Sequence, residues 1–66
     1  MIITFNGDRF ELSGPMTVSD LLRQLDIDCR RVAVEHNLVV LRRSTFDSTL
    51  IAEGDRIEVV NFVGGG

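Results

Sequence analysis

The sequence contains no lysine, tryptophan or tyrosine, and it has one cysteine and one proline. Without a second cysteine the chain cannot form an internal disulfide, and one unpaired thiol is typical of a reducing compartment, so we expect a cytoplasmic protein. All seven basic residues are arginine. The absence of lysine removes every side-chain amine that an activated acyl group could modify, although codon bias explains the same composition.

The chain is also short and has no long apolar run. Its 66 residues suffice for one domain with a thin core. Such a domain is too small to enclose a deep catalytic pocket, so we expect a carrier or binding module and not an enzyme. No signal peptide or transmembrane helix is expected. The net charge of −3, without a basic stripe, argues against nucleic-acid and membrane partners.

The first half of the sequence predicts a hairpin followed by a helix. Apolar and polar residues alternate over 2–5 and 9–12, and the intervening Asn6-Gly7 favours a tight hairpin turn. Thr17 and Asp20 have the spacing of an N-terminal capping pair. The helix that follows, ending near Asp26, carries one apolar stripe formed by Val18, Leu21, Leu22 and Leu25.

The second half predicts three further strands. They span residues 32–36, 38–41 and 56–62, with loop and one helical turn, capped by Ser44, between the last two. One helix must pack on one face of a mixed sheet of four to five strands, with the first and last strands side by side in its centre. This order predicts an α+β domain of the β-grasp type over residues 1–63 and a flexible glycine tail over 64–66.

The tail is the candidate functional group. Gly64, Gly65 and Gly66 have no side chains to pack, and an extended tail of this length reaches roughly 10 Å into a channel too narrow for side chains. The carboxylate of Gly66 is a poor electrophile until it is coupled to AMP, after which a sulfur nucleophile can convert it to a thiocarboxylate. A cloning remnant or a frayed end is the alternative explanation.

The sequence resembles the ThiS family, the small ubiquitin-like sulfur carriers of bacterial thiazole (thiamine) biosynthesis. The resemblance covers essentially the whole chain, and its most specific part is the closing run 54–66, which joins Gly-Asp, an alternating strand and the terminal glycines. Two departures are Leu41, where the family commonly has proline, and Phe46, where it often has tryptophan. The other matching residues are Asn6-Gly7, Thr17-Val18, Leu21-Leu22, Val32-Ala33-Val34, Asn37, Val39-Val40 and Arg42.

The resemblance implies a cycle in which other proteins act on Gly66. An adenylating enzyme of the ubiquitin-activating type would use Mg-ATP to form the acyl-adenylate, and a cysteine desulfurase would supply sulfur for the thiocarboxylate. Thiazole synthase would receive that sulfur. The carrier would be a co-substrate that binds no cofactor itself. Alternatives are a carrier for another product such as molybdopterin, a ubiquitin-like protein modifier, and an interaction domain with an inert tail.

The last strand also suggests a docking surface. If Ile57 faces the helix, Val60 and Phe62 lie on the opposite face of the sheet, and with Val63 they would form an apolar patch beside the tail. The alternative is a bulge near Asn61 that turns Phe62 into the core.

The remaining chemically active side chains predict no catalytic or metal site. Cys29 is the only thiol, and its distance in sequence from His36 gives no sign of a Cys-His pair. Asp26 and Asp28 lack the further ligands that a metal would need. We therefore interpret these residues as parts of solvated loops and turns.

Overall fold

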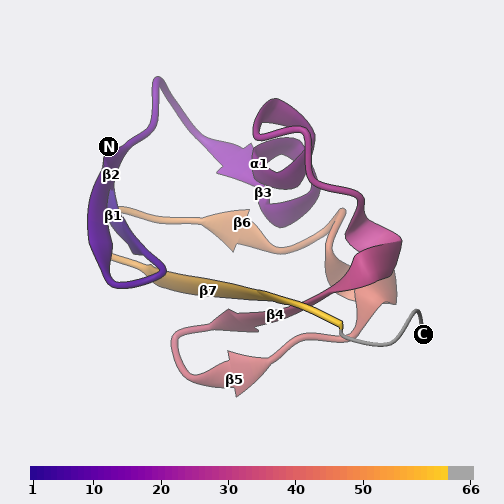
Figure 1. Ribbon diagram of the computed structural model, residues 1–66. Helices are drawn as coiled ribbons and strands as arrows, with labels where there is room; N and C mark the ends of the chain where they lie inside the picture. Colours follow the sequence, from indigo (N-terminus) through magenta and orange to yellow (C-terminus); the bar gives the residue numbers. More distant parts are fainter. Residues whose placement is uncertain (63–66) are drawn as a thin grey trace.

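The computed structural model describes residues 1–62, in which one α-helix lies across one face of a five-stranded mixed sheet (Figure 1). The sheet order is β2-β1-β7-β4-β5, in which β1 and β7 run parallel and the other neighbours antiparallel. This is the predicted β-grasp arrangement, with the first and last strands adjacent in the middle. Its strands are β1 (Ile2–Phe5), β2 (Asp8–Glu11), β4 (Val32–His36), β5 (Val39–Val40) and β7 (Arg56–Asn61).

The first hairpin forms where the sequence predicts it. Asn6 and Gly7 have positive φ values of 49° and 86°, as a two-residue turn of this type requires. The turn sets the register of β1 and β2 from Phe5 opposite Asp8 to Ile2 opposite Glu11. This register places Ile3, which is only 1% exposed, on the face that meets the helix.

Helix α1 (Val18–Gln24) begins at the predicted cap. The Asp20 N–H donates to the Thr17 hydroxyl and the Thr17 N–H donates to the Asp20 carboxylate, both over 3.1 Å. The helix ends two residues before the predicted limit because Asp26 has a φ of 60°. The N–H groups of Asp26 and Ile27 donate to the C=O groups of Arg23 and Leu22, the pattern that closes many helices around a left-handed residue.

Three short elements were not predicted, and the cap of a fourth differs from the prediction. The pair β3 (Met16–Thr17) and β6 (Leu50–Ile51) forms a second, two-stranded sheet that the sequence did not indicate. A 3-10 turn, η1 (Cys29–Arg31), follows the helix. The second 3-10 turn, η2 (Arg43–Thr45), was expected, but Ser44 as its cap was wrong: the turn begins after Arg42 and has no side-chain cap, because Ser44 lies inside it.

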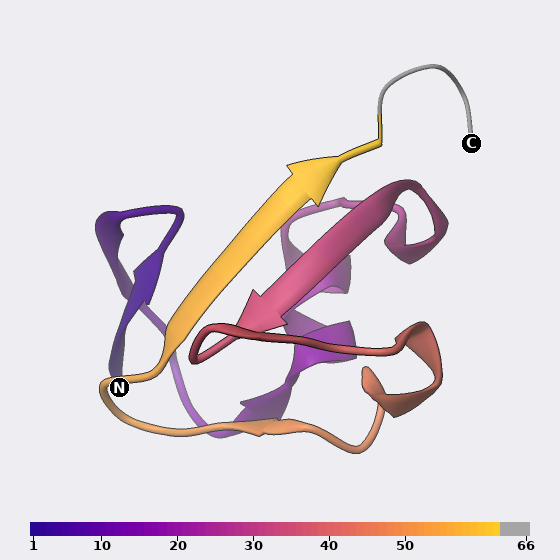
Figure 2. The same ribbon diagram turned by 90° about the horizontal axis from the view of Figure 1, so that it is seen from below.

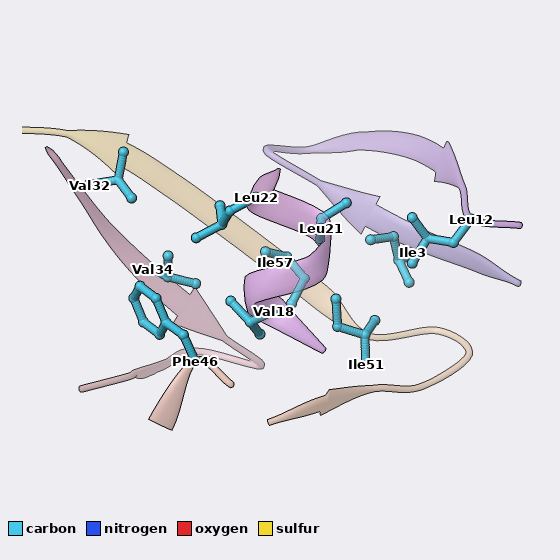
Figure 3. Close-up of a cluster of buried hydrophobic side chains, with 10 residues drawn as sticks. All are labelled: Ile3, Leu12, Val18, Leu21, Leu22, Val32, Val34, Phe46, Ile51 and Ile57. Carbon is cyan, nitrogen blue, oxygen red and sulfur yellow. The ribbon is translucent and has the colours of Figure 1, made fainter. Parts of the chain in front are cut away.

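The core fills the space between α1 and the sheet (Figure 3). Phe46, one of the two departures from the family pattern, is 3% exposed and belongs to this core, and Leu41 packs against it. The loop between β5 and β6 therefore closes one end of the core. The buried cluster comprises Ile3, Leu12, Val18, Leu21, Leu22, Val32, Val34, Phe46, Ile51 and Ile57.

None of the helices within residues 1–62 has the length and apolar character needed to cross a membrane.

Candidate functional site

The candidate site is approached along β7, the central strand that leads to the glycine tail. On one side β7 pairs with β4 along nearly its whole length, from Ile57 opposite His36 to Asn61 opposite Val32. One further bond continues this pairing, since the Phe62 N–H donates to the Arg31 C=O over 2.9 Å. The backbone is thus fixed by β4 and η1 as far as Phe62.

On its other side β7 is held first by β1 and then by a side chain. The pairing of β1 with β7 ends at Phe5 opposite Ile57. Beyond it, the Val59 N–H donates to the Asn6 amide oxygen over 2.7 Å, and the Asn6 amide nitrogen donates to the Val59 C=O over 3.3 Å. Asn6 therefore substitutes for the next residue of a strand. The sequence identified Asn6 as a turn residue but gave no sign of this second role.

Figure 2 shows the sheet from the side opposite α1, which we call the open face. The open face carries the alternate residues of each strand. Ile57 is fully buried toward the helix, so Val60 points the other way and is 64% exposed. Phe62 is 51% exposed. The pairing of β7 with β4 continues through Asn61 without a bulge, so Phe62 does not turn into the core. The expected position of Val60 and Phe62 is confirmed, whereas their role in docking stays a prediction.

The rest of the predicted site lies outside the described residues. It comprises Val63 of the docking patch, the tail residues Gly64 and Gly65, and Gly66, the predicted carrier residue. The predicted boundary between a domain over 1–63 and a tail over 64–66 also falls there. The described part ends with an anchored strand whose last residues expose apolar side chains.

A polar cluster centred on Asp55 lies at the opposite end of β7, where the strand begins. The Asp55 carboxylate accepts hydrogen bonds from the His36 Nε2–H (2.7 Å), the Asn37 amide (3.1 Å) and the Ala52 N–H (2.8 Å). Burial alone raises the pKa of Asp55, but these hydrogen bonds outweigh it and hold the pKa below its ordinary value of 3.8. Asn37 also accepts from the Arg56 N–H over 2.8 Å. The cluster thereby connects the β4–β5 turn to the start of β7.

The other chemically active side chains do not form a site with the tail. His36 is engaged by Asp55 and not by Cys29, which is half-buried and lines a hollow of about 310 Å³ beside Arg23 and Arg43. Asp28 accepts from the Arg30 backbone and guanidinium, and these bonds lower its pKa to about 2. Among residues 1–62 no three or more histidine, cysteine, aspartate or glutamate side chains are grouped to hold a metal ion.

Comparison with known proteins identifies the family. A family model described as the ThiS family matches residues 3–66. The chain belongs to the ThiS family. A solved structure from Geobacter metallireducens, described as the thiamine biosynthesis protein ThiS, superposes with a TM-score of 0.88 and 38% identity, with both chains covered completely. This ThiS structure supports the β-grasp fold of the described residues.

Two curated relatives extend the comparison to proteins named for a function. The sulfur carrier protein ThiS of Bacillus subtilis is 34% identical over 50 residues, which are 76% of each chain. A protein from Paramagnetospirillum magneticum named thiazole synthase is 41% identical over all 66 residues. The chain spans 20% of the length of that thiazole synthase, so the similarity concerns one segment of a much larger protein.

Proposed function

We propose that this chain is a sulfur carrier of thiamine biosynthesis and that its reactive group is the carboxylate of Gly66. In this function the chain is a co-substrate and not an enzyme. An adenylating enzyme of the ubiquitin-activating type binds Mg-ATP and recognises the carrier. The carboxylate attacks the α-phosphate, pyrophosphate leaves, and Gly66 becomes an acyl-adenylate.

The second step replaces oxygen by sulfur. A persulfide on a cysteine desulfurase, or on a protein loaded by one, attacks the acyl carbon, so that a C–S bond forms and AMP leaves. The product is an acyl disulfide, and a thiol must supply two electrons to cleave its S–S bond. Cleavage releases the Gly66 thiocarboxylate and a disulfide. Thiazole synthase is the proposed acceptor, which is supported by the similarity of the chain to a segment of a protein bearing that name.

The structural observation that carries the proposal is how β7 is held. Val59 is bonded on one side by Asn6 and Phe62 on the other by Arg31, so the residues that lead to the tail start from a fixed point. The exposed side chains of Val60 and Phe62 lie next to that point. A partner that docks on them would hold β7 at a fixed place shortly before the glycine residues in the sequence, which favours a reaction that needs accurate positioning of a single carboxylate.

The proposal is tested by intact mass spectrometry. The protein is incubated with its adenylating enzyme, Mg-ATP, a cysteine desulfurase, cysteine and a thiol reductant. We expect a mass gain equal to the difference between one sulfur and one oxygen atom, located by fragmentation at Gly66. A protein lacking Gly66 should fold normally and show no gain. No gain in the intact protein, with an enzyme active on a known carrier, would refute the proposal.

Two controls separate this reaction from others. The variant Cys29→Ser should gain the same mass, which excludes a persulfide on the only thiol as the source of the signal. Larger conjugates with other proteins would indicate a protein modifier instead of a carrier. Addition of thiazole synthase or of a molybdopterin precursor with its synthase then shows which acceptor discharges the thiocarboxylate.

A further inference from the structure

Two glutamates face each other across the centre of the open face. Glu35 of β4 is directly opposite Glu58 of β7 in the register of the sheet. Residues directly opposite on antiparallel strands have Cβ atoms about 5 Å apart, and like charges in this position destabilise the pair of strands. Both glutamates are half-buried, so water screens their repulsion less than it would at a fully exposed site.

No cation among the described residues neutralises this pair. The salt bridges within residues 1–62 are Arg23–Asp20, Arg30–Asp28 and His36–Asp55. Arg56 lies on the same face two residues before Glu58, but it forms no salt bridge with either glutamate. Glu35 and Glu58 therefore have no ion-pair partner among residues 1–62.

The glutamate pair has exposed apolar side chains on two sides. Val40 of β5 is opposite Glu35 and is 68% exposed. Val60, two residues after Glu58 on the same face, is opposite Ala33 of β4. Beyond Val60 lies Phe62, at the end where the tail begins. The open face thus places two carboxylates beside exposed apolar side chains, and a docking partner with a cation at this point would be complementary in charge to them.

We infer that the Glu35–Glu58 pair receives an arginine or lysine side chain from the partner protein that docks on the open face. The cation would lie between the two carboxylates while Val40, Val60 and Phe62 contact apolar groups around it. A second copy of this chain does not fit, because it would bring an identical glutamate pair and a net charge of −3 to the interface. The inference rests on the proposed function in one respect: the partner used for the test is the adenylating enzyme.

The inference predicts opposite effects on stability and on docking. The variants Glu35→Gln and Glu58→Gln relieve the repulsion, so each should raise the melting temperature by about 1–5 °C. Each removes one carboxylate from the partner's cation, so each should raise the KM for the carrier about tenfold in adenylation, with kcat unchanged. The variant Glu35→Arg places opposite charges on the two strands and should raise both the melting temperature and the KM further.

A matched control is Glu11→Gln. Glu11 is exposed on β2, opposite Ile2, at the far edge of the sheet. The variant removes the same charge from the chain and should leave melting temperature and KM close to the wild-type values. Raising the ionic strength should weaken binding of the wild type more than binding of Glu58→Gln, because salt screens the contact between the partner's cation and the Glu58 carboxylate.

Calorimetric titration of the carrier into the adenylating enzyme without ATP keeps docking measurable even if Gly66 is not modified. Binding without a mass gain would refute the carrier chemistry and leave the docking inference standing. The inference is overturned if the wild type does not bind. It is also overturned if both glutamine variants bind as tightly as the wild type, or if they melt at a lower temperature, since the pair would then be part of the structure and not a receptor for a cation.

Discussion

The two ends of β7 are held in different ways. At its start, Asp55 accepts three hydrogen bonds and Asn37 bonds the backbone of Arg56, so the strand begins inside a closed polar cluster. At its end, β7 is paired with β4 as far as Asn61, but on its other side only the Asn6 amide holds it, and the side chains of Val60 and Phe62 are exposed. The start of β7 connects it firmly to the domain, whereas the end leaves apolar surface available to a partner.

Two asparagines make this difference concrete. Asn6 and Asn37 occupy the turns of the hairpins on either side of β7, with positive φ values of 49° and 51°. Both bond the backbone of β7 through their side-chain amides. Asn37 does so next to Asp55 and His36, whereas Asn6 acts where no strand is paired on its side of β7. The same residue type thus supports a rigid cluster at one end and replaces a missing strand at the other.

The largest effect should come from breaking the polar cluster. The variant Asp55→Ala leaves the Ala52 N–H, His36 and Asn37 without their acceptor, and we expect it to lower the free energy of unfolding by about 2–4 kcal/mol. Urea denaturation measures this change. The control Asp47→Ala removes an exposed carboxylate and should change stability very little. Equal stability of both variants would show that the cluster does not hold the start of β7.

Removing the Asn6 amide should have a smaller effect. The variant Asn6→Gly keeps a residue suited to positive φ but loses both bonds to Val59, which should lower the free energy of unfolding by about 1–2 kcal/mol. Hydrogen exchange should show faster exchange of the Val59 amide than in the wild type. Asn6→Asp retains the acceptor and should lie between the two; a glycine variant as stable as the wild type would contradict the role of the amide.

Truncating Phe62 should change docking without changing stability. Because Phe62 is half exposed and outside the core cluster, Phe62→Ala should alter the free energy of unfolding by less than about 0.5 kcal/mol. It should raise the KM for the carrier in adenylation about tenfold. Leu50→Ala is the matched control, since Leu50 is 67% exposed but lies on β6. Unchanged KM in Phe62→Ala would argue against docking at this end.

The smallest effect should be the loss of stability when the pH is lowered. The pKa of Asp55 is below 3.8 in the folded protein, so its contribution to stability is complete above that ordinary value and is lost as the pH falls through the folded pKa. Melting temperatures measured from neutral pH to below pH 3.8 should decline at the acidic end. Asp55→Asn should show a flatter decline; an identical profile would assign acid sensitivity to other carboxylates.

The sequence predicted the elements whose signals are local. Alternation over residues 2–5, the Asn6-Gly7 turn and the Thr17–Asp20 cap each involve neighbours along the chain, and the structure confirms them. The strands β3 and β6 were missed because two residues are too few to show a period. The helix was extended to Asp26 because an aspartate in the left-handed region carries no clear local signal, unlike glycine.

The candidate site was predictable only in part. The alternation of β7 placed Val60 and Phe62 on the open face only on the condition that Ile57 faces the helix and no bulge follows, and the structure meets both conditions. The bonds from Asn6 to Val59 and from Asn37 to Arg56 join residues far apart in sequence, and only the folded arrangement brings them together. The same is true of Glu35 and Glu58, which are unremarkable surface glutamates until the register places them opposite one another.

The central position of β7 also determines when the protein can fold during translation. Among the described elements it is the last to leave the ribosome, yet β1 and β4 meet only through it. A nascent chain that stops before residue 56 can form its hairpins and its helix, but it lacks the strand that joins the hairpins into one sheet. The helix then has no complete sheet to pack on, and the chain remains exposed to proteases. Any molecule that has folded has therefore been translated at least through β7, so truncations that end before this strand are removed before they can compete with the folded protein.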